Sequence, residues 1–477
     1  MRGASSMVSS GGMRVSPARQ IAFEILRRVE TADAFAADLL HARLSEASAP
    51  RKRADAALAT ELTLGVLRWQ RLLDFLLERY AGRPVADFDL EVLLALRLGL
   101  YQLRFLTRVP ARAAVNESVE LVKWARKGSA ARLVNAVLRR ASSEKESAVN
   151  APLEQIEQQL SPDLPPAERL GILYSHPTWM VERWLQCFGA ARTKALLETD
   201  NRPARVMCTL LDPAHAEGAT SALREAGLSI EPGRMLGSAW STRGGDPTDT
   251  EAFRRGWISI QDEASQLVAL LLDAGPGRSI LDLCAAPGGK TAVLARAAGP
   301  QSLVIAADRH LHRLRATKTN LNRLGVTSVH LLALDATAPL PLAASFDRIL
   351  VDAPCSGTGT LSRNPEIRWR LGPNDLAEFH RRQVALLSSA LDRLAPGGRL
   401  VYSTCSLEPE ENEQVVAEVL RGRREIRRVS GLGVAALKPH LAPGVNPNEL
   451  FDREENFRTF PPEHQTDGFF AAILESP

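Results

Sequence analysis

The chain has 477 residues, 45% hydrophobic and 24% charged, with a formal net charge of +4. A single hydrophobic core rarely grows past about 250–300 residues, so we predict more than one domain. The five cysteines are widely spaced, which excludes a disulfide framework and a CxxC metal site and favours a reducing, cytoplasmic location. We expect no membrane partner, because no uncharged apolar run approaches the roughly 18 residues of a membrane span, and the Ser/Gly-rich start is no secretory signal.

The first part of the chain is predicted to be helical. Residues 1–13 are expected to form a flexible tail, and residues 14–145 a compact all-α domain. Apolar residues recur there at spacings of three and four, which is the repeat of one helix face. One such stripe consists of Leu62, Val66, Trp69, Leu73 and Leu76.

The middle of the chain changes character. Residues 146–167 are rich in Ser, Glu, Gln and Pro and end in a Pro-Pro pair, so we predict a linker. Residues 168–262 mix helical patterns with strand-like runs, and we expect a small α+β subdomain there. Basic residues are clustered, as in Arg51-Lys52-Arg53 and Arg421 to Arg428, and clustering permits nucleic-acid binding more than the net charge does.

Residues 263–477 alternate short apolar strands with helical segments. This alternation is typical of a parallel, doubly wound α/β sheet of the Rossmann type. In such sheets ligands bind beyond the carboxyl ends of the strands. The predicted strands are Ser279 to Cys284, Leu303 to Ala307, Ser328 to Leu332, Phe346 to Val351 and Arg399 to Ser403.

The first of these strands leads into a loop of small residues, Cys284-Ala285-Ala286-Pro287-Gly288-Gly289-Lys290. Small residues let the backbone approach a ligand closely, and the start of the next helix offers free N–H groups and a positive dipole end. The loop has neither the glycine spacing of a Walker A loop nor the G-x-G-x-x-G of dinucleotide-binding folds. Alone it is a weak sign of a cofactor site.

Acidic residues at the next two strand ends strengthen this interpretation. Asp308 is placed to accept hydrogen bonds from two ribose hydroxyls, and Asp335 from an adenine amino group. A single Asp at such a position is as often a helix cap or a turn residue. The ordered set without a phosphate clamp predicts S-adenosylmethionine rather than ATP or NAD.

Two cysteines follow the fourth and fifth strands, Cys355 in an Asp-Ala-Pro-Cys run and Cys405 in a Thr-Cys-Ser run. We therefore expect both thiols at the same edge of the sheet. A thiolate is a strong nucleophile, and a nearby cation such as Lys290 would lower the pKa of the thiol. These patterns predict a cofactor pocket with two thiols and leave the substrate open. The other cysteines are interpreted as small, chemically inert side chains: Cys187, Cys208 and Cys284.

Three motifs, DLCAAPGGKT, DAPCSGTGT and STCSLEPEEN, closely resemble those of the Nop/Sun family of RNA cytosine-5 methyltransferases. The resemblance implies a Rossmann-like class I methyltransferase domain with a seven-stranded sheet, in which Gly468 to Leu474 adds an antiparallel strand. It implies that Cys405 is the nucleophile and that Cys355 aids proton removal and product release. It also assigns cofactor contacts to the following positions: Cys284 to Lys290, Asp308, Asp335 and Asp352.

The chemistry of that family explains the need for a thiol. Cytosine C5 is a poor nucleophile, and addition of a thiolate to C6 turns C5 into an enamine carbon that attacks the methyl group of the cofactor. Asp352 would hydrogen-bond the amino group and N3 of the base. The expected catalytic residues are thus Cys405, Cys355, Asp352 and Lys290.

The helical domain narrows the resemblance. Residues 116–121 and 132–140 resemble a NusB-like RNA-binding domain, and with the three motifs this is similar to the bacterial Sun type. That type implies small-subunit (16S) ribosomal RNA as partner, not in a fully assembled ribosome, and a monomeric enzyme. Arg139 and Arg140 are the expected RNA contacts, with Arg368 as a further candidate. The target base must leave its stack to enter the pocket.

Other functions stay open at this point. The RNA can be a transfer RNA or another ribosomal site. An assembly factor that kept the fold without the chemistry needs neither thiol, and a methyltransferase of exocyclic amines carries a D/N-P-P-aromatic tetrad where this chain has Asp-Ala-Pro-Cys. DNA cytosine methyltransferases take their nucleophile from a Pro-Cys motif, so the presence of both thiols favours RNA.

Overall fold

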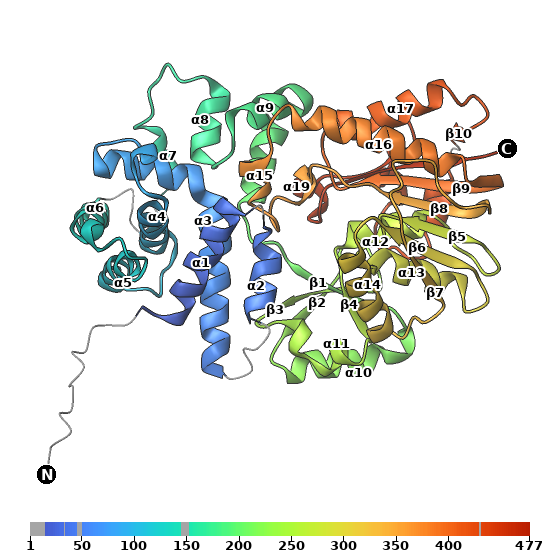
Figure 1. Cartoon of the computed structure of the whole chain (residues 1–477), viewed down its shortest axis with the longest axis horizontal. Helices are drawn as coiled ribbons and strands as arrows, with labels where there is room; N and C mark the ends of the chain where they lie inside the picture. Colours follow the sequence, from blue (N-terminus) through green and yellow to red (C-terminus); the bar gives the residue numbers. More distant parts are fainter. Residues whose placement is uncertain (1–14, 33, 45–49, 145–151, 429–430) are drawn as a thin grey trace, which may run out of the picture. The chain divides into compact units, whose positions relative to one another are not determined.

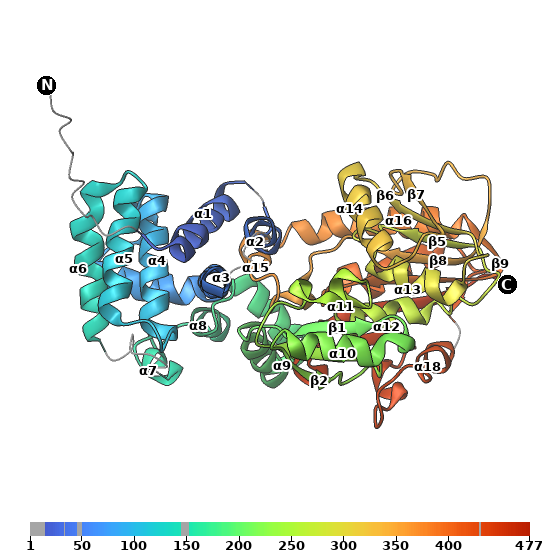
Figure 2. The same cartoon turned by 90° about the horizontal axis from the view of Figure 1, so that it is seen from below.

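The structure is a computed structural model that describes residues 15–477 apart from 33, 45–49, 145–151 and 429–430 (Figures 1 and 2). The chain divides into two compact units. The first runs to Arg202 and also includes Asn364–Arg370, and the second consists of Pro203–Arg363 and Leu371–Pro477. The predicted tail lies outside the described residues, as do the side chains of the first basic cluster.

In its described residues the first unit contains helices and connecting loops but no β-strand. The predicted stripe of apolar side chains on residues 62–76 is buried, except for the partly buried Trp69, and it belongs to one continuous core. The predicted all-α domain is thereby confirmed. The helices are α1 (Pro17–Thr31), α2 (Ala36–Leu44), α3 (Pro50–Ala81), α4 (Leu90–Phe105), α5 (Ala111–Trp124), α6 (Ala131–Ser143), α7 (Leu153–Glu157), α8 (Pro166–Leu173), α9 (Thr178–Asp200) and α15 (Ile367–Arg370).

The boundary of the helical unit differs from the prediction. Part of the predicted linker forms α7, and its Ile156, together with Leu160, is buried in the helical core. Helices α8 and α9, expected in the α+β subdomain, belong to the helical unit as well. The reason is that exposed Glu and Gln side chains dominate the composition of this stretch, whereas a few apolar side chains, Ile156 and Leu160 with the partly buried Leu153 and Leu164, pack it against the core.

The second unit begins with the α+β subdomain. Its four strands form an antiparallel sheet in the order β2-β3-β1-β4. Apolar residues of the sheet and its helices, among them Cys208, Leu223 and Ile258, make a small separate core. The elements are β1 (Val206–Leu210), α10 (Ala216–Glu225), β2 (Ser229–Pro232), β3 (Ala239–Arg243), α11 (Glu251–Arg254) and β4 (Ile258–Ile260).

A large mixed sheet forms the rest of the second unit. In the described residues its order is β10-β12-β9-β8-β5-β6-β7, with β11 against β12. Strands β5 to β9 run parallel and β12 runs antiparallel to β9, which confirms the predicted strands. The strands are β5 (Ile280–Leu283), β6 (Val304–Asp308), β7 (Val329–Ala333), β8 (Phe346–Asp352), β9 (Leu394–Thr404), β10 (Arg427–Arg428), β11 (Phe457–Thr459) and β12 (Phe469–Glu475).

Helices cover both faces of this sheet (Figure 1). Successive residues of a strand point to opposite faces, so Ile280 joins the core under α12 and α13, whereas Leu281 joins the core under α16 and α17. No helix in the described part of the chain is long and apolar enough to cross a membrane. The helices are α12 (Glu263–Leu271), α13 (Gly289–Ala298), α14 (Leu311–Arg323), α16 (Asp375–Leu391), α17 (Glu413–Arg421), α18 (Leu432–Leu437) and α19 (Pro461–His464).

Candidate active site

The sheet topology brings the predicted motifs to one edge. Strand β5 lies between β6 and β8, and β8 lies beside β9, all in parallel register. The carboxyl ends of these strands therefore share one edge of the sheet, where ligands of doubly wound folds bind. The cofactor loop follows β5, and the two cysteine loops follow β8 and β9.

The two thiols meet as predicted. The sulfur atoms of Cys355 and Cys405 are 3.3 Å apart and share a hydrogen bond. The two loops are also joined through the backbone, because the N–H of Gly359 donates to the carbonyl oxygen of Cys405 at 3.0 Å. The hydrogen bond with Cys405 and burial raise the pKa of Cys355 well above its ordinary value.

Lys290 and Asp352 form an ion pair at the same edge of the sheet. The ammonium group donates to Asp352 Oδ2 at 2.7 Å, and the hydroxyl of Ser403 donates to Oδ1 at 2.9 Å. The ring of Phe469 lies 5.2 Å from the ammonium nitrogen, as in a cation–π contact. Lys290 was expected to lower the pKa of a thiol, but the hydrogen bond of its ammonium group is to Asp352.

The cofactor loop turns into α13 at a glycine with a left-handed backbone conformation. Gly288 has a φ of +92°, a left-handed conformation that favours glycine, and it precedes the first turn of α13. A β-carbon there would lie 2.8 Å from the methyl carbon of Thr317. The loop is thus packed closely on α14, with the free N–H groups of α13 behind it.

Asp282, within the buried strand β5, is a site residue that was not among the predicted cofactor contacts. Its Oδ2 accepts a hydrogen bond from the Thr291 hydroxyl at 2.6 Å, whereas its buried Oδ1 has no hydrogen-bond partner among the described residues. Burial raises the pKa of Asp282 to about 7. The available signal was a carboxylate in an otherwise apolar strand.

A cavity of about 320 Å³ adjoins the loop. Asp282, Lys290 and Asp352 line it on the side of the sheet, together with loop residues 284–287 and 289. The α+β subdomain supplies another wall, which the sequence analysis missed: Thr248, Phe253, Ser259 and Ile260, with Gln261 beside them. The small-residue loop, the two carboxylates and the unpartnered Oδ1 fit a cofactor that carries an ammonium group and a sulfonium cation.

Asp308, the last residue of β6, and Asp335, which follows β7, are not among the residues that line this cavity. Asp308 is buried, and its Oδ1 accepts a hydrogen bond from the N–H of His310 at 2.9 Å. Asp335 caps a turn, because its Oδ1 accepts hydrogen bonds from the N–H and hydroxyl of Thr337, which lower its pKa. Both residues lie at the carboxyl ends of their strands, as predicted. Their contacts with adenosine remain a prediction.

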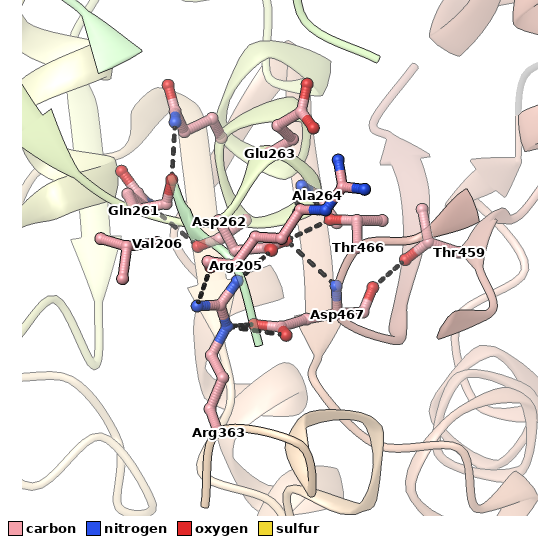
Figure 3. Close-up of polar contacts among 12 residues, drawn as sticks. Arg205, Val206, Gln261, Asp262, Glu263, Ala264, Arg363, Thr459, Thr466 and Asp467 are labelled. Carbon is pink, nitrogen blue, oxygen red and sulfur yellow. Dashed lines mark hydrogen bonds and ion pairs between the residues drawn. The ribbon is translucent and has the colours of Figure 1, made fainter. Parts of the chain in front are cut away.

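Arg363, at the end of the Cys355 loop, forms a partly buried ion cluster that the sequence did not reveal (Figure 3). Its guanidinium donates to Asp467 at 2.8 Å, to Asp262 at 2.7 Å and to the carbonyl oxygen of Arg205 at 2.9 Å. Asp262 also caps α12 by accepting from the N–H of Ala264. The cluster fixes the end of the Cys355 loop against α12 and the start of β12, and burial raises the pKa of Asp467 to about 7.

The expected RNA contacts divide into two kinds. Arg368 is completely buried in the helical unit, where it donates to the Ser175 carbonyl oxygen and to Asn201 Oδ1, each at 3.0 Å. The structure therefore contradicts the prediction that it contacts RNA: backbone and amide oxygens hold the guanidinium inside. Arg139 and Arg140 are exposed on α6, as an RNA contact requires.

The doubly wound sheet with its antiparallel last strand, the cofactor loop and the carboxylate-lined cavity together define an S-adenosylmethionine-dependent methyltransferase. The model of the 16S rRNA methyltransferase RsmB/F family matches residues 269–475, and that of the NusB family matches residues 16–143. The chain belongs to the RsmB/F family, and its first unit contains a NusB domain.

Individual relatives agree over nearly the whole chain. The chain is 35% identical to the probable ribosomal RNA small subunit methyltransferase B of Synechocystis sp., over 96% of this chain and 99% of the relative. It is 32% identical to the Bacillus subtilis protein of the same description, over 97% and 99%. The crystal structure of PH0851 superposes with a TM-score of 0.78 at 26% identity, covering 97% of this chain and 99% of that one. These matches confirm the family resemblance, the class of enzyme and the cofactor.

Proposed function

We propose that the protein methylates C5 of a cytosine in small-subunit (16S) ribosomal RNA through a covalent bond between Cys405 and C6 of the base. The observation that carries this proposal is the 3.3 Å contact between the sulfur atoms of Cys355 and Cys405, at the same edge of the sheet as the cofactor loop. A methyltransferase of amines or hydroxyls needs no thiol. Carbon 5 of cytosine becomes nucleophilic only after a group has added to C6.

Cys405 forms the covalent bond in the first step of the reaction and breaks it in the last. Its thiolate adds to C6, so a sulfur–carbon bond forms and the electrons of the C5–C6 double bond become available at C5. The bound cofactor supplies an electrophilic methyl group, which C5 takes. After C5 loses its proton, the C5–C6 double bond returns and the sulfur–carbon bond breaks, which frees Cys405 as a thiolate.

We assign the release step to Cys355. Its raised pKa keeps it protonated at neutral pH, so it donates a hydrogen bond to the sulfur of Cys405 while that sulfur carries charge. We assign removal of the C5 proton to Cys355 as well: once the adduct has formed, its own proton passes to solvent, and its thiolate then takes the proton from C5. Without Cys355 the adduct is expected to persist.

Asp352 and Lys290 are assigned to the base and the cofactor. The side chain of Asp352 is 28% exposed and lines the cavity, where it can accept hydrogen bonds from the base amino group. Lys290 holds that carboxylate in place. We assign the methionine end of the cofactor to the loop from Cys284 to Lys290, its ribose to Asp308 and its adenine to Asp335.

The nature of the RNA is inferred from the relatives, whose names specify the small ribosomal subunit. The exposed Arg139 and Arg140 of the NusB domain provide phosphate contacts. We further propose that the enzyme is a cytoplasmic monomer. It is proposed to act before the subunit is fully assembled, since the target base has to leave its stack.

The proposal is tested by transfer of labelled methyl groups to small-subunit RNA that lacks the modification, with the product nucleoside identified. We expect 5-methylcytidine from the wild type, none from Cys405→Ala, and a covalent protein–RNA complex from Cys355→Ala. Cys187→Ala is the matched control, because Cys187 is exposed on α9. Undiminished transfer by Cys405→Ala would refute the mechanism, and transfer to transfer RNA alone would refute the substrate.

A further inference from the structure

One buried carboxylate joins the two loops that carry the thiols. Glu411 is 0% exposed and ends the short 3₁₀ helix Pro409–Glu411, which follows β9 and the Cys405 loop. Its Oε2 accepts a hydrogen bond from the N–H of Ser356 at 2.8 Å, and its Oε1 accepts one from the hydroxyl of Ser406 at 2.6 Å. Each of these serines directly follows one of the two cysteines.

Further contacts fix the position of Glu411 itself. The side-chain amide of Gln383, on α16, donates to Glu411 Oε2 at 2.9 Å and to the carbonyl oxygen of Pro354 at 3.0 Å. The phenol of Tyr402, on β9, donates to the backbone carbonyl oxygen of Glu411 at 2.6 Å. Tyr402 of the sheet thus holds the backbone of Glu411, and Gln383 of a helix holds its carboxylate. The residue after Cys355 bonds to Glu411 directly, and the residue before it is connected to Glu411 through Gln383.

Burial of a carboxylate is costly unless hydrogen bonds replace its hydration. In the described part of the chain no Lys, Arg or His side chain forms an ion pair with Glu411, so three hydrogen bonds compensate its charge. Two of those donors are neighbours of the thiols. A residue that served packing alone would not need a charge here, whereas a carboxylate can accept from both loops at once.

We propose that Glu411 is a positioning residue that sets the distance between the thiols of Cys355 and Cys405. The effect of Glu411 on catalysis rests on the proposed function, whereas its effect on the distance between the thiols does not. The charge of Glu411 also contributes to the raised pKa of Cys355, after the hydrogen bond with Cys405 and burial. Glu411 therefore acts on the thiol pair without touching the substrate.

The test uses phenylarsine oxide, whose trivalent arsenic bonds to two sulfur atoms when they are close together. Two thiols and one molecule of phenylarsine oxide give the cyclic dithioarsenite and one water, so no redox partner is needed. The full-length protein carries Cys187→Ser to remove the exposed thiol. Glu411→Gln keeps the shape of the side chain and one acceptor oxygen, and Glu418→Gln, exposed on α17, is the control.

We expect Glu411→Gln to weaken arsenical binding about tenfold, since a hydrogen bond to a charged group accounts for a factor of that order. Glu418→Gln should bind as the wild type does, and Cys355→Ala should show no dithiol binding. Ser406→Ala, which removes a single contact of the carboxylate, should give a smaller loss. Wild-type affinity in both Glu411→Gln and Ser406→Ala would overturn the proposal.

Methyl transfer by the same variants separates this inference from the proposed function. Glu411→Gln should lower kcat about tenfold and leave KM for RNA unchanged, because Glu411 positions the thiols and does not bind RNA. Loss of arsenical affinity in Glu411→Gln, with no methyl transfer by the wild type, leaves the positioning role standing and refutes the proposed function. If Glu411→Gln and Ser406→Ala both bind the arsenical as the wild type does and transfer methyl groups at the normal rate, the positioning role alone is refuted.

Discussion

Lys290 Nζ lies 2.7 Å from Asp352 Oδ2, and this ion pair links the cofactor loop after β5 to the strand end that precedes Cys355. Partly buried pairs of this kind are stronger than exposed ones, because solvent screens them less. The contact places the groups assigned to the cofactor and to the base within one hydrogen-bonded unit.

Replacement of Asp352 by Asn should slow methyl transfer strongly. The amide cannot balance the charge of Lys290, and it donates where the carboxylate accepts, so we expect methyl transfer to fall at least about 100-fold. Steady-state kinetics with labelled cofactor measure the effect. Asp375→Asn, exposed at the start of α16, is the control, and equal activity of the two variants would contradict the assignment.

Gly288→Ala should disturb the cofactor loop by more than the strain of an alanine at positive φ. Both Gly288 and Gly299 have positive φ, and each Ala substitution costs about 1 kcal/mol of unfolding free energy through strain. Only at Gly288 would the new β-carbon also press on Thr317, since Gly299 has nothing within 4 Å. Calorimetry should therefore show weaker cofactor binding for Gly288→Ala and none of this loss for Gly299→Ala.

The buried carboxyl of Asp282 should make stability depend on pH. Its folded pKa of about 7 lies above its ordinary value of 3.8, so between these pH values the folded state holds the proton more tightly. Stability from this group is fully present below pH 4 and is lost as the pH rises toward 7, by about 1.4 kcal/mol per pH unit at most.

Denaturant unfolding of the wild type and Asp282→Asn at pH 5, 6 and 7 isolates this contribution, because the other titrating groups are common to both. The stability of the wild type relative to the variant should fall as the pH rises. A difference between the two that does not change with pH would show that the carboxyl is charged throughout.

Arg368→Ala should destabilise the protein rather than weaken RNA binding directly. The substitution leaves the carbonyl oxygen of Ser175 and the side chain of Asn201 buried without their donor, and we expect a loss of about 3 kcal/mol of unfolding free energy. Denaturant unfolding measures the loss. Arg381→Ala, at an exposed site, should change stability by less than about 0.5 kcal/mol.

Arg139→Ala and Arg140→Ala should show the opposite behaviour. Both side chains are exposed, so stability should stay within about 0.5 kcal/mol of the wild type. If each contacts a phosphate, each substitution lowers the slope of log affinity against log salt by about one. Filter binding across a salt series measures the slope, and an unchanged slope would remove these arginines from the RNA interface.

The parts of this molecule that follow from local sequence were predicted correctly. The parallel strands, the loop of small residues after the first of them and the meeting of Cys355 with Cys405 all depend on residues adjacent in the chain or on the rule that parallel strand ends share an edge. The spacing of apolar residues and the placement of Gly and Pro determine such features.

Contacts between distant residues escaped the sequence analysis. Nothing near Arg363 in the sequence indicates that it pairs with Asp262 and Asp467, about 100 residues away on either side. Arg368 has the residue type of an RNA contact, and only its burial shows that it serves the helical core. Burial of a charged residue depends on its partners, which the local pattern does not contain.

The most direct test of the covalent mechanism uses small-subunit RNA that contains 5-fluorocytidine, incubated with the protein and S-adenosylmethionine. Fluorine cannot leave C5 as a proton does, so release is blocked and the adduct accumulates. Mass spectrometry of the digested complex should place the RNA on the peptide that contains Cys405, with no adduct in Cys405→Ala. An adduct on Cys355, or none in the wild type while methylation of unmodified RNA proceeds, would contradict the assignment of Cys405 as the nucleophile.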